Sequence, residues 1–291
     1  MILAAPHDRR PARACLVTLA LVATLGGASA LRAEAIDPRV ELALAVYDPS
    51  FDSKVRLDSD VLGLGTGLDL ERDLGIESSS QELRAEVGFR LGRRFRLDAD
   101  HVGFDRSGHN TLTRQVQFGD VVYAANADLA ARVKSTHTGV SLRFSFVSTP
   151  TTDVAVSLGG SWLDVSAELS GLASATASGV PVGSALIAEK GEASGPVPLV
   201  GLHGAFWAGD RVRLRLDARY FDLDTFLNDY KGWSGSMTEY GFGADWFVLP
   251  WLAVSGGYAG TRIDADFDDG DNIGSVKYAF DGFRLGTIFA F

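Results

Sequence analysis

The apolar residues of this chain recur at every second position from about residue 39 to the last residue, and this period constrains the fold more than any other feature. In "ELRAEVGFRL" (82–91), the Leu, Ala, Val, Phe and Leu residues alternate with Glu, Arg, Glu, Gly and Arg. "RVRLRLDARY" (211–220) repeats the pattern, with Arg and Asp on the polar side. Because successive side chains of a strand point to opposite faces, strict alternation over this length predicts half-buried β-strands.

The connections between the alternating segments are of two kinds, and they favour a membrane barrel over a soluble sandwich. Short turns at 92–94, 148–153, 208–211 and 249–251 alternate with long polar connections at 49–80, 105–126, 169–198, 224–235 and 266–275. Transmembrane barrels have this arrangement, and a tilted strand of about 9–11 residues crosses the bilayer. We therefore predict an all-β fold, a transmembrane antiparallel up-and-down β-barrel.

Four short turns with both termini on one side predict about ten strands. Their cores are expected at 39–48, 81–91, 94–104, 136–147, 153–163, 198–207, 211–222, 237–248, 252–263 and 276–291. The number becomes twelve if 49–80 or 111–134 folds back as extra strands, and eight if one hairpin is misread.

The N-terminus has the layout of a secretory signal peptide. Its basic start at Arg9, Arg10 and Arg13 precedes an apolar run over 15–25, and small residues follow at Ala28, Ala30, Ala33 and Ala35. We expect a signal peptide over 1–30, with cleavage after Ala30 or Ala35, a short tail over 31–38 and the barrel over 39–291. Retention of the segment as an anchor is the alternative. The sole cysteine, Cys15, leaves with the signal, so the exported chain has no disulfides.

The exported chain is acidic. Removing residues 1–30 takes away three Arg and one Asp, which moves the formal charge from −10 to −12. An acidic chain is a poor partner for nucleic acid. We expect no cofactor, and a monomer, since a closed barrel leaves no sheet edge to pair.

The chain ends on an aromatic strand. Phe283, Leu285, Phe289 and Phe291 share one face, and Phe291 is the last residue. Aromatic residues also gather beside the short turns (Phe95, Phe146, Trp207, Trp246 and Trp251) and toward the long loops (Tyr220, Tyr240, Tyr258 and Tyr278). Two such belts are typical of membrane interfaces.

In these features the chain resembles Gram-negative outer-membrane β-barrel proteins, broadly the small barrels of the OmpA and OmpW types. The resemblance implies a location in the cell outer membrane, with lipid and lipopolysaccharide as surroundings. It also implies that Phe283, Leu285, Phe289 and Phe291 form an assembly signal, which the barrel assembly machinery reads.

If the apolar residues face lipid, the charged positions face the lumen. This set comprises Glu82, Arg84, Glu86, Arg90, Arg96, Asp98, Asp100, Arg143, Arg213, Arg215, Asp217, Arg219, Glu239, Asp245 and Arg284. Both signs are mixed, so each charge can find a partner. Ten strands predict a narrow interior, either a salt-bridged core or a narrow solute path. Arg143, Arg213, Arg215, Arg219 and Arg284 would bias an open path toward anions.

Motifs for catalysis or metal binding are weak. His101, His109 and His203 are nominal candidates for a hydrolase at the rim of the barrel, but no His-x-Ser pattern occurs. "DADFDDGDN" (264–272) fails as an EF-hand, because Asp269 and Ser275 stand where Gly and Glu are needed. "GLGTG" (63–67) lacks the strand and helix of a phosphate-binding loop. We therefore expect no enzyme and no metal site.

The leading functional expectation is an integral, porin-like barrel of the cell envelope, either structural or a narrow pore for small solutes, with anions favoured by the lumen arginines. The alternative is a surface-binding, adhesin-type barrel that acts through its acidic loops.

Overall fold

The computed structural model describes residues 38–58, 67–118, 121–177, 180–223, 225, 233–268 and 273–291. The predicted signal peptide, both cleavage sites and nearly all of the tail lie outside these residues. Among the described residues, no helix is both long and apolar enough to cross a membrane.

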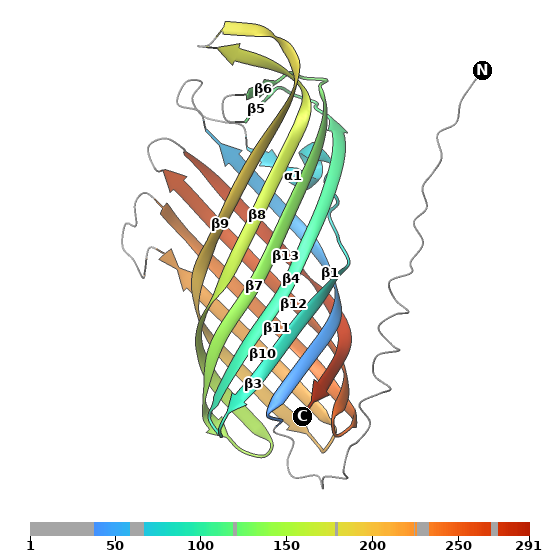
Figure 1. Cartoon of the computed structure of the whole chain (residues 1–291), viewed down its shortest axis with the longest axis vertical. Helices are drawn as coiled ribbons and strands as arrows, with labels where there is room; N and C mark the ends of the chain where they lie inside the picture. The colour runs from blue at the N-terminus through green and yellow to red at the C-terminus, as the bar shows by residue number, and fades with distance from the viewer. Residues whose placement is uncertain are drawn as a thin grey trace, which may run out of the picture. The chain divides into compact units, whose positions relative to one another are not determined.

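Ten antiparallel strands close into a ring (Figure 1). They are β1 (Val40–Leu57), β3 (Glu82–Leu91), β4 (Phe95–Thr111), β7 (Asp128–Ser148), β8 (Thr152–Ala177), β9 (Val180–Ala208), β10 (Val212–Asp222), β11 (Trp233–Leu249), β12 (Leu252–Asp268) and β13 (Ile273–Ala290). Each pairs with the next, and β1 closes on β13 from Glu41↔Ala290 to Leu57↔Gly274. The predicted barrel and its ten strands are confirmed.

The strands are longer at the long-loop end than the sequence indicated. The segment 169–198, expected as a loop, belongs to a hairpin in which β8 and β9 pair as far as Ala177↔Val180. Gly, Ala and Ser dominate this segment, so its hydropathy carries no period of two, and the backbone ladder alone defines it. This hairpin forms the tall part of the sheet at the top of Figure 1.

The short elements stand apart from the ring. They are β2 (Leu68–Asp69), α1 (Leu70–Leu74), β5 (Val116–Phe118) and β6 (Val121–Tyr123). β2 pairs only with the upper part of β1, and β6 pairs with the distal part of β8. Neither 49–80 nor 111–134 therefore adds a strand to the ring, and the twelve-strand alternative is wrong.

An apolar band surrounds the outside of the barrel. The outward side chains of Phe283 and Leu285 on β13, and of Phe291 directly after it, are 66–72% exposed, whereas Arg284 is 8% exposed. Large apolar side chains are likewise exposed on the outside of the other strands, at Leu42, Val46, Leu83, Val87, Phe89, Leu97, Leu142, Leu158, Leu202, Leu216, Phe242, Trp246 and Val254. Beyond the band, charges appear on the outward positions at Asp48, Asp105, Lys134, Asp164, Asp222, Arg262 and Asp281. A closed sheet with an apolar exterior satisfies its backbone internally, as hydrocarbon requires.

Two of the predicted interface aromatics face inward instead. Trp207 packs on the buried Phe247, with ring centroids 5.1 Å apart, and Tyr278 is 7% exposed. Both residues lie near the ends of their strands, as expected, but each occupies one of the alternating positions that face the lumen. At the upper edge of the band Trp162 points outward, and its indole nitrogen donates to Ser194 Oγ at 3.0 Å.

Candidate functional site: the barrel lumen

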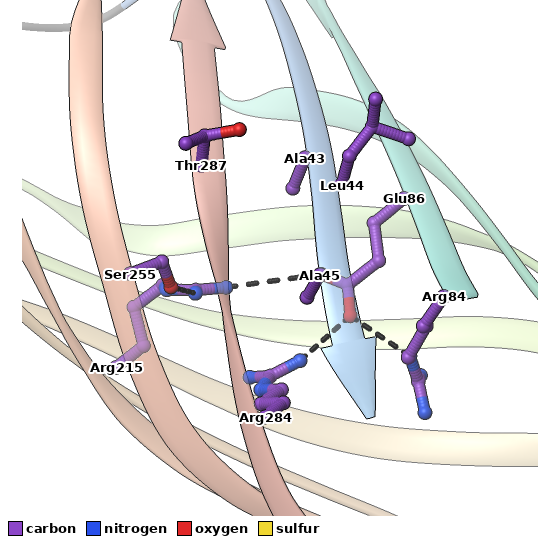
Figure 2. A pocket seen from close by; sticks show the side chains of 9 residues that line it. All are labelled: Ala43, Leu44, Ala45, Arg84, Glu86, Arg215, Ser255, Arg284 and Thr287. Carbon is purple, nitrogen blue, oxygen red and sulfur yellow. Dashed lines mark hydrogen bonds and ion pairs between the residues drawn. The ribbon is translucent and has the colours of Figure 1, made fainter. Parts of the chain in front are cut away.

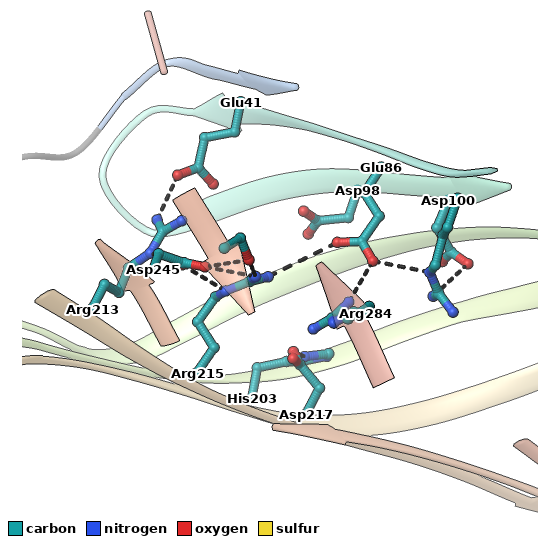
Figure 3. Close-up of polar contacts among 12 residues, drawn as sticks. Glu41, Glu86, Asp98, Asp100, His203, Arg213, Arg215, Asp217, Asp245 and Arg284 are labelled. Carbon is teal, nitrogen blue, oxygen red and sulfur yellow. Dashed lines mark hydrogen bonds and ion pairs between the residues drawn. The ribbon is translucent and has the colours of Figure 1, made fainter. Parts of the chain in front are cut away.

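The half of the lumen nearer the short turns is filled by a network of ion pairs (Figure 3). Every member has at least one oppositely charged partner within 4.0 Å. The arginines are Arg84, Arg96, Arg143, Arg213, Arg215, Arg219 and Arg284. The carboxylates are Glu41, Glu86, Asp98, Asp100, Asp217, Glu239 and Asp245.

Asp245 is the most deeply buried carboxylate of the network, and it joins three strands. Its side chain is fully buried and lies 2.9 Å from Arg213 Nε and 2.7 Å from Arg215 Nε. Ser255 Oγ on β12 donates a further hydrogen bond at 2.7 Å. Arg213 in turn binds Glu41 on β1. A carboxylate in this setting is solvated by protein donors instead of water, which is the condition for a stable buried charge.

A second group of contacts centres on two carboxylates nearer the middle of the lumen. Glu86 accepts from Arg284 at 2.6 Å and from Arg84 at 3.0 Å. Asp100 lies 3.1 Å from Arg84 and 3.2 Å from Arg219. The shared arginine links the two carboxylates, so the network is continuous across the lumen.

Inward-facing glycines make room for these long side chains. A Cβ atom at Gly88 would lie 2.0 Å from the Arg96 guanidinium, and one at Gly139 would lie 2.5 Å from Asp100 Oδ1. The small residues at lumen positions therefore complement the charged ones on neighbouring strands.

A small cavity remains where side chains of β1, β3, β10, β12 and β13 meet (Figure 2). Its lining includes Arg84, Glu86, Arg215, Ser255 and Arg284. The volume is about 10 Å³, close to the minimum of about 10–15 Å³ that one water molecule needs. This cavity can hold about one water molecule and is too small for an organic solute.

An aromatic layer covers the network toward the long-loop end. Its rings pack edge to face, for example Phe51 on Phe104 at 5.1 Å and Phe104 on Phe280 at 5.1 Å. Tyr47 is fully buried, and its hydroxyl donates to the Ala259 carbonyl at 2.9 Å. Apolar rings packed in this way exclude water from the centre of the barrel.

Above the aromatic layer, α1 and its flanks pack against the inner wall. Arg106 on β4 is fully buried and donates to Glu71 Oε1 at 2.7 Å and to the Glu77 carbonyl at 3.0 Å. Its guanidinium lies 3.7 Å from the centroid of the Phe51 ring. Apolar residues complete the layer at Leu68, Leu70, Leu74, Ile76, Leu112, Leu129, Val133 and Leu169.

Most of the lumen positions expected from the sequence come together in this structure. The network contains Arg84, Glu86, Arg96, Asp98, Asp100, Arg143, Arg213, Arg215, Asp217, Arg219, Glu239, Asp245 and Arg284. Arg90 lies 3.7 Å from Asp153 at the short-turn end. Glu82 is separate, and accepts from Ser80 Oγ at 2.9 Å.

Sequence reasoning missed Glu41, Arg106 and Glu71. Glu41 is the second residue of β1 and follows the same alternation, so its parity was available as a signal. Arg106 lies beyond the predicted end of its strand, and Glu71 lies in a segment expected to be a loop.

In the network the arginines and carboxylates balance, so the arginines provide no excess positive charge to attract anions.

The three nominal histidines do not form one site. His101 points outward and contacts Thr138 Oγ1 through Nδ1 at 2.9 Å. His109 is also exposed, whereas His203 is buried inside the barrel. Residues 264–268 of the acidic segment belong to β12, and 269–272 lie outside the described residues. In the described part of the chain, no three His, Cys, Asp or Glu side chains are grouped as metal ligands.

No protein-family model and no curated protein matches the chain. One solved structure that resembles it is the translocator domain of the autotransporter NalP from Neisseria meningitidis. The two chains are 13% identical, the match covers 86% of this chain and 89% of that chain, and the TM-score is 0.42. A second is OprG from Pseudomonas aeruginosa, which is 13% identical. That match covers 87% of this chain and 94% of OprG, with a TM-score of 0.34. A third is Ail from Yersinia pestis, which is 9% identical. That match covers 84% of this chain and 97% of Ail, with a TM-score of 0.28.

OprG is described as an outer membrane protein and the NalP fragment as a translocator domain, and at TM-scores below 0.5 these likenesses support no assignment for this chain. The assignment rests on the chain's own features, which are the closed ten-stranded ring, the apolar exterior and the charged interior. The protein is a closed β-barrel of the transmembrane type.

Proposed function

We propose that this protein is a closed barrel that does not conduct solutes and acts at the cell surface through the part of its sheet beyond the membrane. Ion pairs, packed rings and the α1 segment fill successive levels of the lumen, which supports a closed interior. In this proposal the barrel lies in a Gram-negative outer membrane as a monomer surrounded by lipid and lipopolysaccharide. A cleaved signal peptide exports it, and its C-terminal aromatics direct assembly.

The observation that carries the surface role is the free edge of β9. β10 pairs with β9 only from Val212↔Ala208 to Tyr220↔Val200. In the described part of the chain, no strand pairs with residues 180–199 on that side, although β8 covers the opposite side throughout. An unpaired edge offers a row of backbone donors and acceptors to an extended peptide.

The hydrogen bonds between β8 and β9 show which backbone N–H groups of β9 point to the unpaired side. The Trp207 N–H donates to the Thr151 carbonyl next to β8, so odd-numbered residues of β9 face β8 and even-numbered residues face the open side. Pro196 and Pro198 are even-numbered and lack an N–H, which blunts the edge near the barrel. The even positions from 184 to 194, which lie in the same unbroken register, keep their N–H groups. We infer that an extended segment of an extracellular polypeptide adds to this stretch as a further strand.

Proline substitutions at even positions test the proposal because they remove edge donors while leaving the ladder to β8 intact. We would select 12-residue peptides from a random library on the refolded barrel and compare their affinities for A188P/E192P and for the control A188T/E192T. Two lost backbone hydrogen bonds of about 0.5–1.5 kcal/mol each sum to about 1–3 kcal/mol, which predicts a loss of roughly 5- to 150-fold in affinity for the proline variant. Equal binding to both variants, or failure to select any peptide, would count against the edge as the binding site.

A further inference from the structure

Three polar side chains on adjacent strands form a relay inside the barrel. Ser157 on β8 lies 2.7 Å from Nε2 of His203 on β9, and Nδ1 of the same ring lies 2.7 Å from Oδ1 of Asp217 on β10. The sheet register fixes this geometry, because His203 stands directly opposite Asp217. Ser157 and His203 are 7% and 4% exposed.

The two ring nitrogens have the roles that nucleophilic catalysis requires. A carboxylate on Nδ1 orients the ring and holds its proton on that nitrogen, which leaves Nε2 free to accept the serine proton. We propose that Ser157 is a nucleophile toward small acyl esters, with His203 as general base and Asp217 as the positioning residue. This inference goes beyond the proposed surface role and is independent of it.

The surroundings of Ser157 fit this role. A Cβ at Gly201, which stands opposite it on β9, would lie 2.4 Å from Ser157 Oγ, so glycine leaves the hydroxyl its space. Arg143 stands opposite Ser157 on the other side, in the β7–β8 register. A guanidinium next to the nucleophile can stabilise the negative charge that develops on the carbonyl oxygen of an ester.

The side chains at this level of the lumen are less completely buried than those around Asp245. The side chains of Arg143 and Asp217 are 28% and 26% exposed, although both face the lumen. Asp153, four residues before Ser157 and near the short-turn end, keeps 28%. In this proposal a small ester enters from the short-turn end and displaces the loosely packed side chains of Arg143 and Asp217, whereas a long acyl chain would not fit beside the ion pairs.

The reaction balances without a further reactant besides water. Ser157 Oγ attacks the carbonyl carbon while His203 Nε2 takes the hydroxyl proton, and the carbonyl electron pair moves to oxygen. The intermediate collapses, the alcohol leaves with the proton from His203, and Ser157 is acylated. Water then adds with His203 again as base, which releases the carboxylic acid and restores Ser157.

A second serine in the same barrel provides a matched control. Ser161 Oγ lies 2.7 Å from Nε2 of His137, but Glu239 Oε1 lies 2.9 Å from the same nitrogen. Among the described residues, Nδ1 of His137 has no hydrogen-bond partner. Ser161 is therefore as close to an imidazole as Ser157 and is also buried, at 0% against 7% exposed, but its histidine lacks the orienting carboxylate on Nδ1.

The experiment treats the folded full-length barrel in detergent with phenylmethylsulfonyl fluoride, a small serine-directed electrophile, and maps the modified residue by mass spectrometry. We expect modification at Ser157 and none at Ser161, together with slow hydrolysis of p-nitrophenyl acetate. Ser157→Ala should abolish both signals, and Ser161→Ala should change neither. His203→Gln should lower the modification rate by about 10²–10⁴-fold.

Asp217→Asn tests the positioning role. It should lower the modification rate while the heat-modifiable mobility of the folded barrel is retained, and Asp217→Glu should recover part of the rate. An unmodified Ser157 in a folded sample would overturn the proposal, as would equal modification of Ser157 and Ser161. Peptide binding at the β9 edge is unaffected by either result, so the two proposals fail separately.

Discussion

Neutralising Asp245 is the sharpest test of the idea that ion pairs hold the barrel interior together. This carboxylate is fully buried and serves both Arg213 and Arg215 at 2.9 and 2.7 Å. Asp245→Asn keeps the shape but leaves two guanidiniums short of a counter-charge. Arg213 retains Glu41, and Arg215 retains Glu86 at 3.9 Å. Breaking a buried pair costs about 3–5 kcal/mol, and these remaining partners place the expected loss at the lower end, about 3 kcal/mol.

The matched control is Asp264→Asn, which removes the same charge from an exposed pair. Asp264 lies 3.3 Å from Lys277, and the two side chains are 55% and 67% exposed. Such pairs contribute about 0–1 kcal/mol. Urea unfolding in lipid vesicles, followed by tryptophan fluorescence and gel mobility, would give both values. Equal destabilisation by the two substitutions, or none by Asp245→Asn, would refute the view that the lumen charges are a buried, mutually dependent network.

Three further predictions concern the segment inside the long-loop end. Arg106→Met leaves the half-buried Glu71 carboxylate with only the Ser53 N–H as a partner, and should cost about 3 kcal/mol and speed amide exchange over 70–74. Unchanged exchange would contradict this anchor. Gly108→Ala places a Cβ 2.4 Å from the Gly75 carbonyl group, so it should displace α1 and speed the same amides, whereas Gly103→Ala, with nothing nearer than 3.8 Å, should not. Burial tends to raise the pKa of Asp73, but hydrogen bonds from Arg72 and the Asp69 N–H, with the charges of Arg72 and Arg114, lower it on balance. Its stabilising contribution is therefore complete above the unfolded pKa of about 3.9 and is lost as pH falls below that value, which exchange over 70–74 between pH 6 and pH 3 would detect.

The sequence predicted the ring well because the signal there is physical and repeated. Each membrane-crossing strand must place apolar side chains on lipid at every second position, as Phe283, Leu285 and Phe291 do. The same parity located the lumen charges. Partners could not be predicted, because contacts such as Arg219 with Asp100 join strands distant in the chain, and the shear of the barrel decides which side chains meet.

The parts that were missed lie where period-two alternation is absent. The hairpin above the membrane is built from Gly, Ala and Ser, which give no hydropathy contrast, so its two strands resembled a loop. The relay of Ser157, His203 and Asp217 comes from three strands, and no local motif marks it. Parity does place all three on the lumen side, which is as far as a single sequence can take the inference.

The central claim is that the lumen is closed, and single-channel recording in a planar bilayer tests it most directly. The sample must first show the gel-mobility shift on heating that marks a formed barrel. We predict a silent bilayer for the folded protein. Reproducible conductance steps from the same sample would contradict the closed lumen, and with it the proposal that the protein acts through its surface edge instead of through a channel.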